Sequence, residues 1–178
     1  MNLVTKGRAI VGSLGIGSAV ITGTELAKID SLNSNAYLVL AEEVTFTETS
    51  GAGTWTGAVS LPAGATILDI IINGMALWTS QTSATLKVGD TGDDDGYYTA
   101  VDLKATDLLA GESLSFAMAG GKAGAYIANS QVSPRYYATA TTINGIITKV
   151  GTTGTAGRTR MVVMYSVSLA TPTAATKV

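Results

Sequence analysis

Residues Leu61 to Phe116 read LPAGATILDIIINGMALWTSQTSATLKVGDTGDDDGYYTAVDLKATDLLAGESLSF, and in them extended apolar runs alternate with short turns of Gly, Asp and Asn. The run ATILDIIING is almost continuously apolar, which is typical of a strand buried on both faces. Asn73–Gly74 is a strong hairpin dipeptide and predicts a turn directly after that strand. The stretch contains no His and no Cys. It therefore indicates a packed sheet and offers no evident catalytic set.

Strand-like segments continue on both sides of this stretch. AYLVLAEEVTFTE and TWTGAVSL precede it, and RYYATATTING, with a second Asn-Gly at Asn144–Gly145, follows it. IITKV and RMVVMYSVSL are expected to close the fold as a hairpin across GTTGTAG. About eight to ten short strands with regular turns predict an all-β fold, an antiparallel β-sandwich or barrel. A jelly-roll-like sandwich is one of the few ways to arrange that many strands.

Three regions are expected along the chain. Residues 1–35 are rich in Gly, which disfavours a long helix by about 1 kcal/mol for each Gly relative to Ala. We interpret them as an extended N-terminal arm that lies along a neighbouring subunit or a host surface, with a short helix possible only at Thr24 to Leu32. Residues 36–170 form the β-sandwich domain. Residues 171–178 are polar and are expected to be a flexible C-terminal tail.

Composition argues for assembly and against several function classes. Charged residues are 13% of the 178, against about 25% in typical domains, which predicts surface hidden in an oligomer or a larger assembly. A monomer coated with Thr, Ser and Gly is the alternative. The net charge is −2 and the 11 basic residues are scattered, so no nucleic-acid partner is expected. No run approaches the roughly 18 apolar residues of a membrane span, so no membrane partner is expected either.

Missing residue types remove most catalytic chemistry. Without His, a Ser-His-Asp triad and any His-ligated metal site are impossible. Without Cys, thiol catalysis and disulfides are excluded. Glu42 and Glu43 are adjacent in a predicted strand and point to opposite faces, so they cannot act as a pair there. We expect no enzymatic activity and no cofactor.

The loop GDTGDDDG is the one candidate for a metal site, with Asp90, Asp93 and Asp95 as weak candidate ligands. Calcium favours carboxylate oxygens on a loop bent by Gly. In an EF-hand alignment, however, Thr91 takes the first ligand position, and strand-like rather than helical sequence follows. The pattern therefore favours a solvated loop without a metal.

Six aromatic residues are candidates for interface contacts, because such side chains are usually anchors of a core or an interface. A carbohydrate-binding platform is the alternative. The six are Trp55, Trp78, Tyr97, Tyr98, Tyr136 and Tyr137.

The stretch from Leu61 to Phe116, continued by RYYATATTINGIITKVGTTGTAGRTRMVVMYSVS, resembles a family of tailed-bacteriophage virion proteins encoded among head genes. The resemblance covers about Thr54 to Ser168, is one of overall pattern, and does not include the N-terminal arm. It implies a capsid decoration (cement) protein with a jelly-roll-like sandwich. It also implies a homotrimer bound to the major capsid protein on the outer surface of the virion. No catalytic residues are carried over.

Two other functions remain open at this point. One is a receptor- or glycan-binding virion module, such as a head fibre or a spike tip, which exposed aromatic residues would favour. The other is a small jelly-roll shell protein that assembles into closed particles by itself.

Overall fold

The structure, a computed structural model, describes residues 4–5, 8–9, 37–104, 106–128 and 135–168. Its contacts divide the chain into two units, residues 1–34 and residues 35–178. In the first unit, the described residues form one antiparallel pair, β1 (Val4–Thr5) with β2 (Arg8–Ala9). The rest of the predicted arm, its possible short helix and the predicted tail lie outside the described residues.

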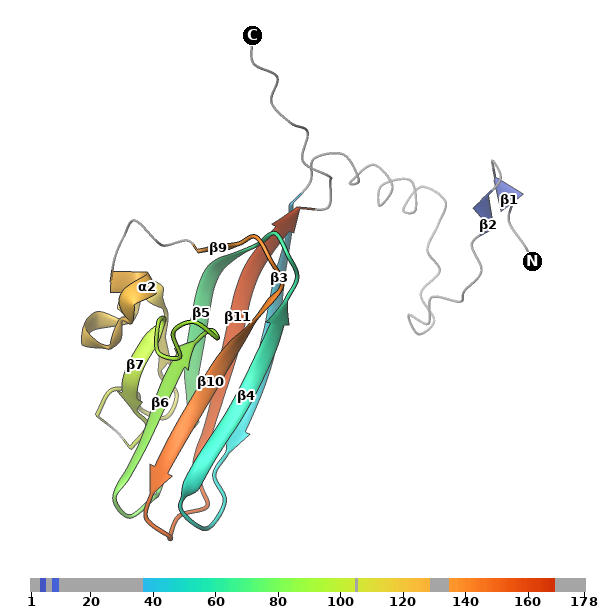
Figure 1. Cartoon of the computed structure of the whole chain (residues 1–178). Coiled ribbons are helices and arrows are strands. Elements are labelled where there is room, and N and C mark those ends of the chain that lie inside the picture. Colours follow the sequence, from blue (N-terminus) through green and yellow to red (C-terminus); the bar gives the residue numbers. More distant parts are fainter. Residues whose placement is uncertain (1–3, 6–7, 10–36, 105, 129–134, 169–178) are drawn as a thin grey trace. The chain divides into compact units, whose positions relative to one another are not determined.

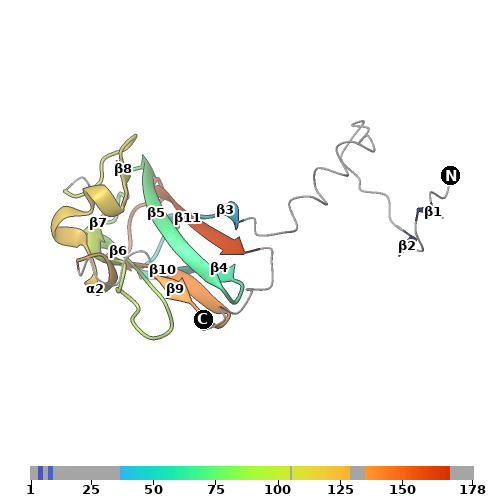
Figure 2. The ribbon, with the colours of Figure 1, turned by 90° about the horizontal axis from the view of Figure 1, so that it is seen from above.

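The second unit consists of strands joined by turns, with three short helical segments late in the chain. In chain order these elements are β3 (Tyr37–Thr47), β4 (Gly53–Leu61), β5 (Ala65–Ala76), β6 (Ser83–Gly89), β7 (Tyr98–Asp102), β8 (Ser113–Leu114), η1 (Phe116–Met118), η2 (Gly120–Lys122), α2 (Ala125–Ala128), β9 (Tyr136–Tyr137), β10 (Thr141–Val150) and β11 (Arg158–Ser168). The helical segments lie on the β7 side of the sandwich (Figure 2). Among the described residues, no helix is long and apolar enough to cross a membrane.

Two antiparallel sheets form the sandwich (Figure 1). The β3 sheet has the order β3-β11-β5-β8, with β9 also paired to β5, and the β4 sheet has the order β4-β10-β6-β7. The strands pair from the outside inward: β3 with β11, β4 with β10, β5 with β8 and β6 with β7. An antiparallel ribbon rolled up in this way is a jelly roll. The predicted fold class, an all-β antiparallel sandwich of jelly-roll type, is confirmed.

The rolled ribbon corrects one predicted hairpin. IITKV and RMVVMYSVSL were expected to pair across GTTGTAG, but β10 belongs to the β4 sheet and β11 to the β3 sheet. Residues 151–157 therefore carry the chain from one layer to the other.

The core lies between the sheets and follows the two-residue period of the strands. On β11, Met161 and Val163 are fully buried, whereas Val162 between them is only partly buried. On β5, Ile70 and Ile72 are fully buried and Ile71 is not. Each sheet therefore has one face in the core and one face outside it.

Both Asn-Gly pairs, expected at turns, lie inside strands instead. Asn73–Gly74 is within β5 and Asn144–Gly145 is within β10. Gly74 is buried against the backbone carbonyl of Leu109, which leaves no room for a Cβ atom. In these strands Gly is required by close packing rather than by a turn.

Phe46 on β3 packs into a gap in the β4 sheet that two glycines create. Gly57 and Gly145 are partners in the β4–β10 register. A Cβ atom on Gly57 would lie 2.9 Å from the Phe46 ring and would clash with Val44 Cγ1. One on Gly145 would lie 2.8 Å from Cζ of Phe46. The two glycines thus let the sheets approach each other at this corner.

We expect Gly57→Ala to lower the free energy of unfolding by about 1–3 kcal/mol, because the added methyl group overpacks the contact with Val44 and Phe46. Gly53→Ala on the same strand is the matched control, since the nearest atom to its added Cβ is 4.0 Å away. Urea denaturation followed by circular dichroism measures both. Equal stabilities of the two variants would contradict this account.

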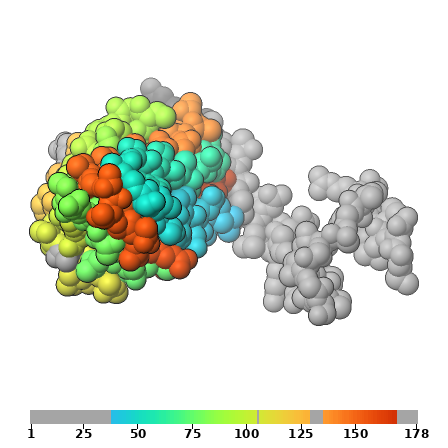
Figure 3. Space-filling view, turned by 90° about the horizontal axis from the view of Figure 1, so that it is seen from below, coloured from blue at the N-terminus to red at the C-terminus, as the bar shows by residue number. Residues whose placement is uncertain are grey.

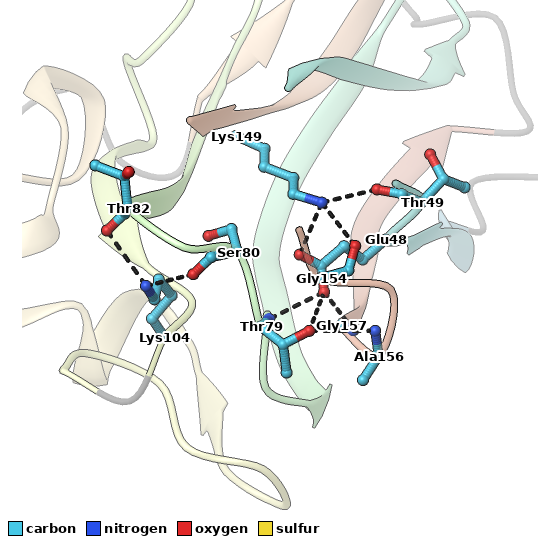
Figure 4. A network of polar contacts seen from close by, with 10 residues as sticks. All are labelled: Glu48, Thr49, Thr79, Ser80, Thr82, Lys104, Lys149, Gly154, Ala156 and Gly157. Carbon is cyan, nitrogen blue, oxygen red and sulfur yellow. Dashed lines mark hydrogen bonds and ion pairs between the residues drawn. The ribbon is translucent and has the colours of Figure 1, made fainter. Parts of the chain in front are cut away.

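A buried ion pair joins the connections at one end of the sandwich (Figure 4). The side chains of Lys149 and Glu48 are fully buried, with 3.2 Å between Nζ and Oε1. Lys149 Nζ also donates to the carbonyl oxygens of Thr49, at 2.7 Å, and Gly154, at 2.8 Å. These contacts tie the segment after β3 to the segment between β10 and β11.

The other carboxylate oxygen of Glu48 holds two more segments. Its Oε2 accepts hydrogen bonds from the backbone N–H and the hydroxyl of Thr79, at 2.9 and 3.0 Å, and from the N–H of Gly157, at 2.9 Å. Burial alone would raise the pKa of Glu48, but these hydrogen bonds and Lys149 hold it below its ordinary value of 4.5. The ionised carboxylate is therefore a structural part of this end of the fold.

We expect Glu48→Gln to destabilise the protein at neutral pH by about 3–5 kcal/mol, because it leaves the Lys149 ammonium buried without a counter-charge. The native pKa of Glu48 is lowered, so its stabilising effect is complete above the unfolded pKa and is lost as the pH falls through the native pKa. The stability difference between wild type and variant should therefore shrink below about pH 4.5. Unfolding curves between pH 3 and pH 7 measure it.

The control is Glu43→Gln, whose carboxylate is exposed and pairs with Arg160 at 3.4 Å. Its effect should be below about 1 kcal/mol. A stability difference for Glu48→Gln that stays constant down to pH 3 would contradict the role of the ionised carboxylate.

Candidate assembly surface

The acidic loop between β6 and β7 is organised by Asp90, which is almost fully buried. Its Oδ1 accepts hydrogen bonds from the N–H groups of Gly92, at 2.8 Å, and Asp93, at 3.0 Å, and from the Tyr126 hydroxyl, at 3.1 Å. Its Oδ2 accepts one from the Tyr137 hydroxyl, at 2.7 Å. Burial would raise the pKa of Asp90, but these hydrogen bonds hold it below its ordinary value.

Arg135 completes the cluster around Asp90. Its guanidinium carbon lies 3.7 Å from the ring centroid of Tyr126, a cation–π contact, and its Nε lies 3.5 Å from Asp90 Oδ2. The hydroxyls of Tyr137 and Tyr97 are 2.9 Å apart. The cluster fastens α2 and β9 to the acidic loop, so its role is to hold the loop in shape.

Of the three candidate metal ligands, Asp93 and Asp95 come together, with Asp94 beside them, and Asp90 does not join them. Asp90 is occupied by its internal hydrogen bonds, whereas the carboxylates of Asp93, Asp94 and Asp95 lie within 4.8 Å of one another. A hydrogen bond with Asp93, partial burial and repulsion from its acidic neighbours raise the pKa of Asp95. Asp94 forms an ion pair with Lys87. The loop has the turn geometry that its Asp and Gly residues favour.

Burial corrects the assignment of most of the six aromatic residues as interface candidates. Four of them are buried in the core: Trp78, Tyr97, Tyr98 and Tyr137. Trp55 is partly buried and packs edge-on against Trp78, with 5.4 Å between the ring centroids. The indole N–H of Trp78 donates to Thr159 Oγ1, at 2.9 Å, and the Tyr98 hydroxyl donates to the carbonyl of Ile70, at 2.6 Å. Of the six, only Tyr136 is well exposed, at 63%, and is available for contact with a partner.

Exposed apolar side chains gather on and beside the β3 sheet. Eight large apolar side chains of the described residues are well exposed, and seven belong to the β3 sheet or flank its strand β8. The seven are Leu38, Val39, Leu68, Met75, Leu109, Met118 and Tyr136. The eighth, Val150, ends β10 in the β4 sheet. A pocket of about 460 Å³ beside β8 is lined in part by Leu108, Leu114 and Met118.

The outer face of the β3 sheet carries six apolar residues beside charged and polar ones. Val162 on β11 is paired with Ile71 on β5 and with Glu43 on β3, and Met164 is paired with Asp69 on β5 and with Ala41 on β3. The apolar side chains among these alternate with core residues along their strands, so they point away from the core. We call the following six residues the outer patch: Val39, Ala41, Leu68, Ile71, Val162 and Met164.

The outer face of the β4 sheet is polar. Its outward positions alternate with buried ones such as Ile143 and Ile147, and most are Ser, Thr, Asn or Lys. They are Thr54, Thr56, Ala58, Ser60, Ser83, Thr85, Lys87, Thr142, Asn144, Ile146, Thr148 and Val150. The two sides of one sandwich therefore differ. Six apolar residues lie outward on the β3 sheet, beside the Glu43–Arg160 pair, whereas the outward positions of the β4 sheet are mostly polar.

The sequence interpretation did not identify the outer patch, although the sequence contains a signal for an apolar outer face. RMVVMYSV carries apolar residues at both odd and even positions, as does ATILDIIING. That pattern was interpreted for ATILDIIING as burial on both faces, but Leu68 is 41% exposed in the single chain. Burial of the second face would require a partner.

Comparison with known proteins gives structural likenesses only. No protein-family model and no curated protein sequence matches the chain. A chain of the cyanophage Pam1 capsid asymmetric unit is 22% identical, with a TM-score of 0.48, and the match covers 75% of this chain and 86% of that one. A chain of the acid-stable capsid of Helicobacter pylori bacteriophage KHP30 is 11% identical, with a TM-score of 0.49, covering 75% and 93%. A chain of the capsid of Ralstonia phage GP4 is 20% identical, with a TM-score of 0.44, covering 72% and 83%.

This chain is thus similar in structure to chains of three phage capsids. Because all three TM-scores are below 0.5, the functional assignment rests on this chain's own residues.

We expect Asp90→Asn to lower the free energy of unfolding by about 1–3 kcal/mol, because an amide replaces an acceptor of four buried or half-buried hydrogen bonds. Asp94→Asn is the control, since that carboxylate is exposed and its ion pair with Lys87 contributes little. Urea denaturation measures both variants. An effect of Asp94→Asn as large as that of Asp90→Asn would contradict the structural role of Asp90.

Proposed function

We propose that this protein is a phage capsid decoration protein, which binds the outer surface of the head through the outer face of its β3 sheet and stabilises the shell. The carrying observation is the contrast between the apolar outer patch and the polar outer face of the β4 sheet. The sequence resemblance to virion proteins encoded among head genes supplies the kind of particle. A homotrimer with the major capsid protein as its partner belongs to the same proposal.

One apolar face and one polar face suit a protein that is bound from one side. Burying apolar area contributes about 25 cal/mol for each Å² removed from water, so the outer patch favours contact with a neutral protein surface. The Thr- and Ser-rich outer face of the β4 sheet can stay exposed to water without a free-energy cost. Several copies linked in a trimer multiply weak contacts into tight binding.

Several charged side chains of the described residues have partners inside the chain, which leaves them less available to a docking partner. Glu48 and Lys149 are buried together, and Asp90 is buried among its hydrogen-bond donors. Lys122 pairs with Asp107 at 2.9 Å.

A glycan-binding function loses its main sequence argument. It required exposed aromatic side chains, and of the six candidates only Tyr136 is exposed. The decoration role needs no catalytic residues.

The test uses particles of the phage that encodes this chain, stripped of the protein and then refilled. Wild-type protein should restore full occupancy and raise the temperature at which the particles release their DNA. Val162→Glu should reduce occupancy at least tenfold, because it buries a charge in the contact. Gel densitometry and thermal release of DNA measure the two effects.

Ile146→Glu is the matched control for this test. Ile146 lies on the central strand β10, is partly buried like Val162, and faces outward from the β4 sheet. Full occupancy with Ile146→Glu and loss with Val162→Glu is the expected result. Stripped particles that release DNA at an unchanged temperature would overturn the stabilising role, and loss of occupancy with Ile146→Glu alone would overturn the assigned face.

A further inference from the structure

Two arginines lie on the outer face of the β3 sheet, beside the outer patch. Arg158 and Arg160 are separated on β11 by the buried Thr159, and Met161 after them is buried too. Because the side chains of a strand alternate, both arginines point to the same side as Val162. β11 begins at the end of the sandwich that Figure 3 shows from below, where orange-red atoms lie at the surface. The outer patch therefore borders on a basic end of the same face.

Arg160 is held in place across the sheet but keeps free donors. Its Nε donates to Asn73 Oδ1 on β5, at 3.0 Å, and Asn73 Nδ2 donates to Ser113 Oγ on β8, at 2.7 Å. On the β3 side, Nη1 donates to Glu43 Oε2 over a long 3.4 Å. A guanidinium has five N–H groups, and two of them find acceptors among the described residues. The side chain is 39% exposed, so the other donors are open to a partner.

The two arginines outnumber the carboxylates beside them. Arg158 is exposed, and its neighbours in the sheet, Thr47 on β3 and Ala76 on β5, are uncharged. Within the part of the chain that the structure describes, Glu43 is the one carboxylate that pairs with either arginine. This end of the face thus has two positive charges and one negative charge, in a chain whose net charge is −2. A carboxylate from outside the chain would complement it.

We propose that Arg158 and Arg160, which we call the basic anchor, bind a carboxylate of the shell protein and so fix the orientation in which the outer patch docks. This inference rests on the proposed function. Burial of apolar area has no direction, whereas the fork of a guanidinium binds a carboxylate in a defined geometry. The apolar residues beside the anchor favour a protein surface over a nucleic acid, which is bound through many phosphates.

The test measures the affinity of fluorescently labelled protein for stripped particles at low and high salt concentration. The double variant Arg158→Gln/Arg160→Gln should bind at least tenfold more weakly at low salt, because it loses charge-assisted hydrogen bonds to the shell. Its affinity should also change less with salt than that of the wild type, since salt screens the lost contact. Lys87→Gln is the matched control and should bind like the wild type. Lys87 is a cation of similar exposure, 36%, paired with Asp94 on the outer face of the β4 sheet.

Glu43→Gln separates a contact with the shell from an internal ion pair. If Arg160 binds the shell, removing the charge of Glu43 frees its guanidinium, and the affinity should stay the same or rise. Wild-type affinity of the double arginine variant would overturn the inference. An equal loss of affinity for Glu43→Gln and Arg160→Gln would overturn it as well, because the internal pair would then be what matters.

Val162→Glu separates the failure of this inference from that of the proposed function. Occupancy that is lost with Val162→Glu but kept with the double arginine variant would overturn the basic anchor alone. Full occupancy with Val162→Glu would overturn the docking face, and the basic anchor with it. Urea denaturation of each variant shows whether a loss of binding comes from unfolding, and for the arginine variants we expect wild-type folding, since both side chains lie at the surface.

Discussion

The organisation of the molecule depends on one constraint: a strand has two faces, and a two-layer sandwich can bury only one face of each sheet. In the β4 sheet the second face is polar, and water satisfies it. In the β3 sheet part of the second face is apolar, with Val162 and Met164 on its central strand. A single chain has no third layer among its described residues to cover that face. The proposed decoration role follows from this imbalance, because a shell surface can act as the third layer.

The polar interior contacts keep the sandwich in one shape without using its surface. Glu48 and Lys149 tie the connections at one end, and Asp90 holds the acidic loop against Tyr137 and Arg135. Each of these charged groups has a partner inside the chain, and the outward positions of the sheets are mostly Thr, Ser and apolar residues, with few charges. A surface of this kind favours close contact with a neutral partner rather than attraction at long range.

The fold class was predictable from the sequence, because the two-residue period and the regular turns report on local geometry. The two Asn-Gly turns were wrong, because Gly74 and Gly145 are needed for contacts with Leu109 and Phe46 that are distant in sequence. The buried aromatic residues could not be separated from interface residues, since composition does not tell a core from a contact. The outer patch was predictable in part: ATILDIIING was recognised as apolar on both faces, but the chain alone does not show what covers the second face.

A reconstruction of the decorated particle by electron cryomicroscopy tests the central claim most directly, because it shows which face of the sandwich meets the shell. The account predicts that the outer patch on β3, β5 and β11 lies in the contact and that Thr56 and Thr148 of the β4 sheet face the solvent. A reconstruction in which the β4 sheet lies on the shell and the outer patch is open to water would contradict it.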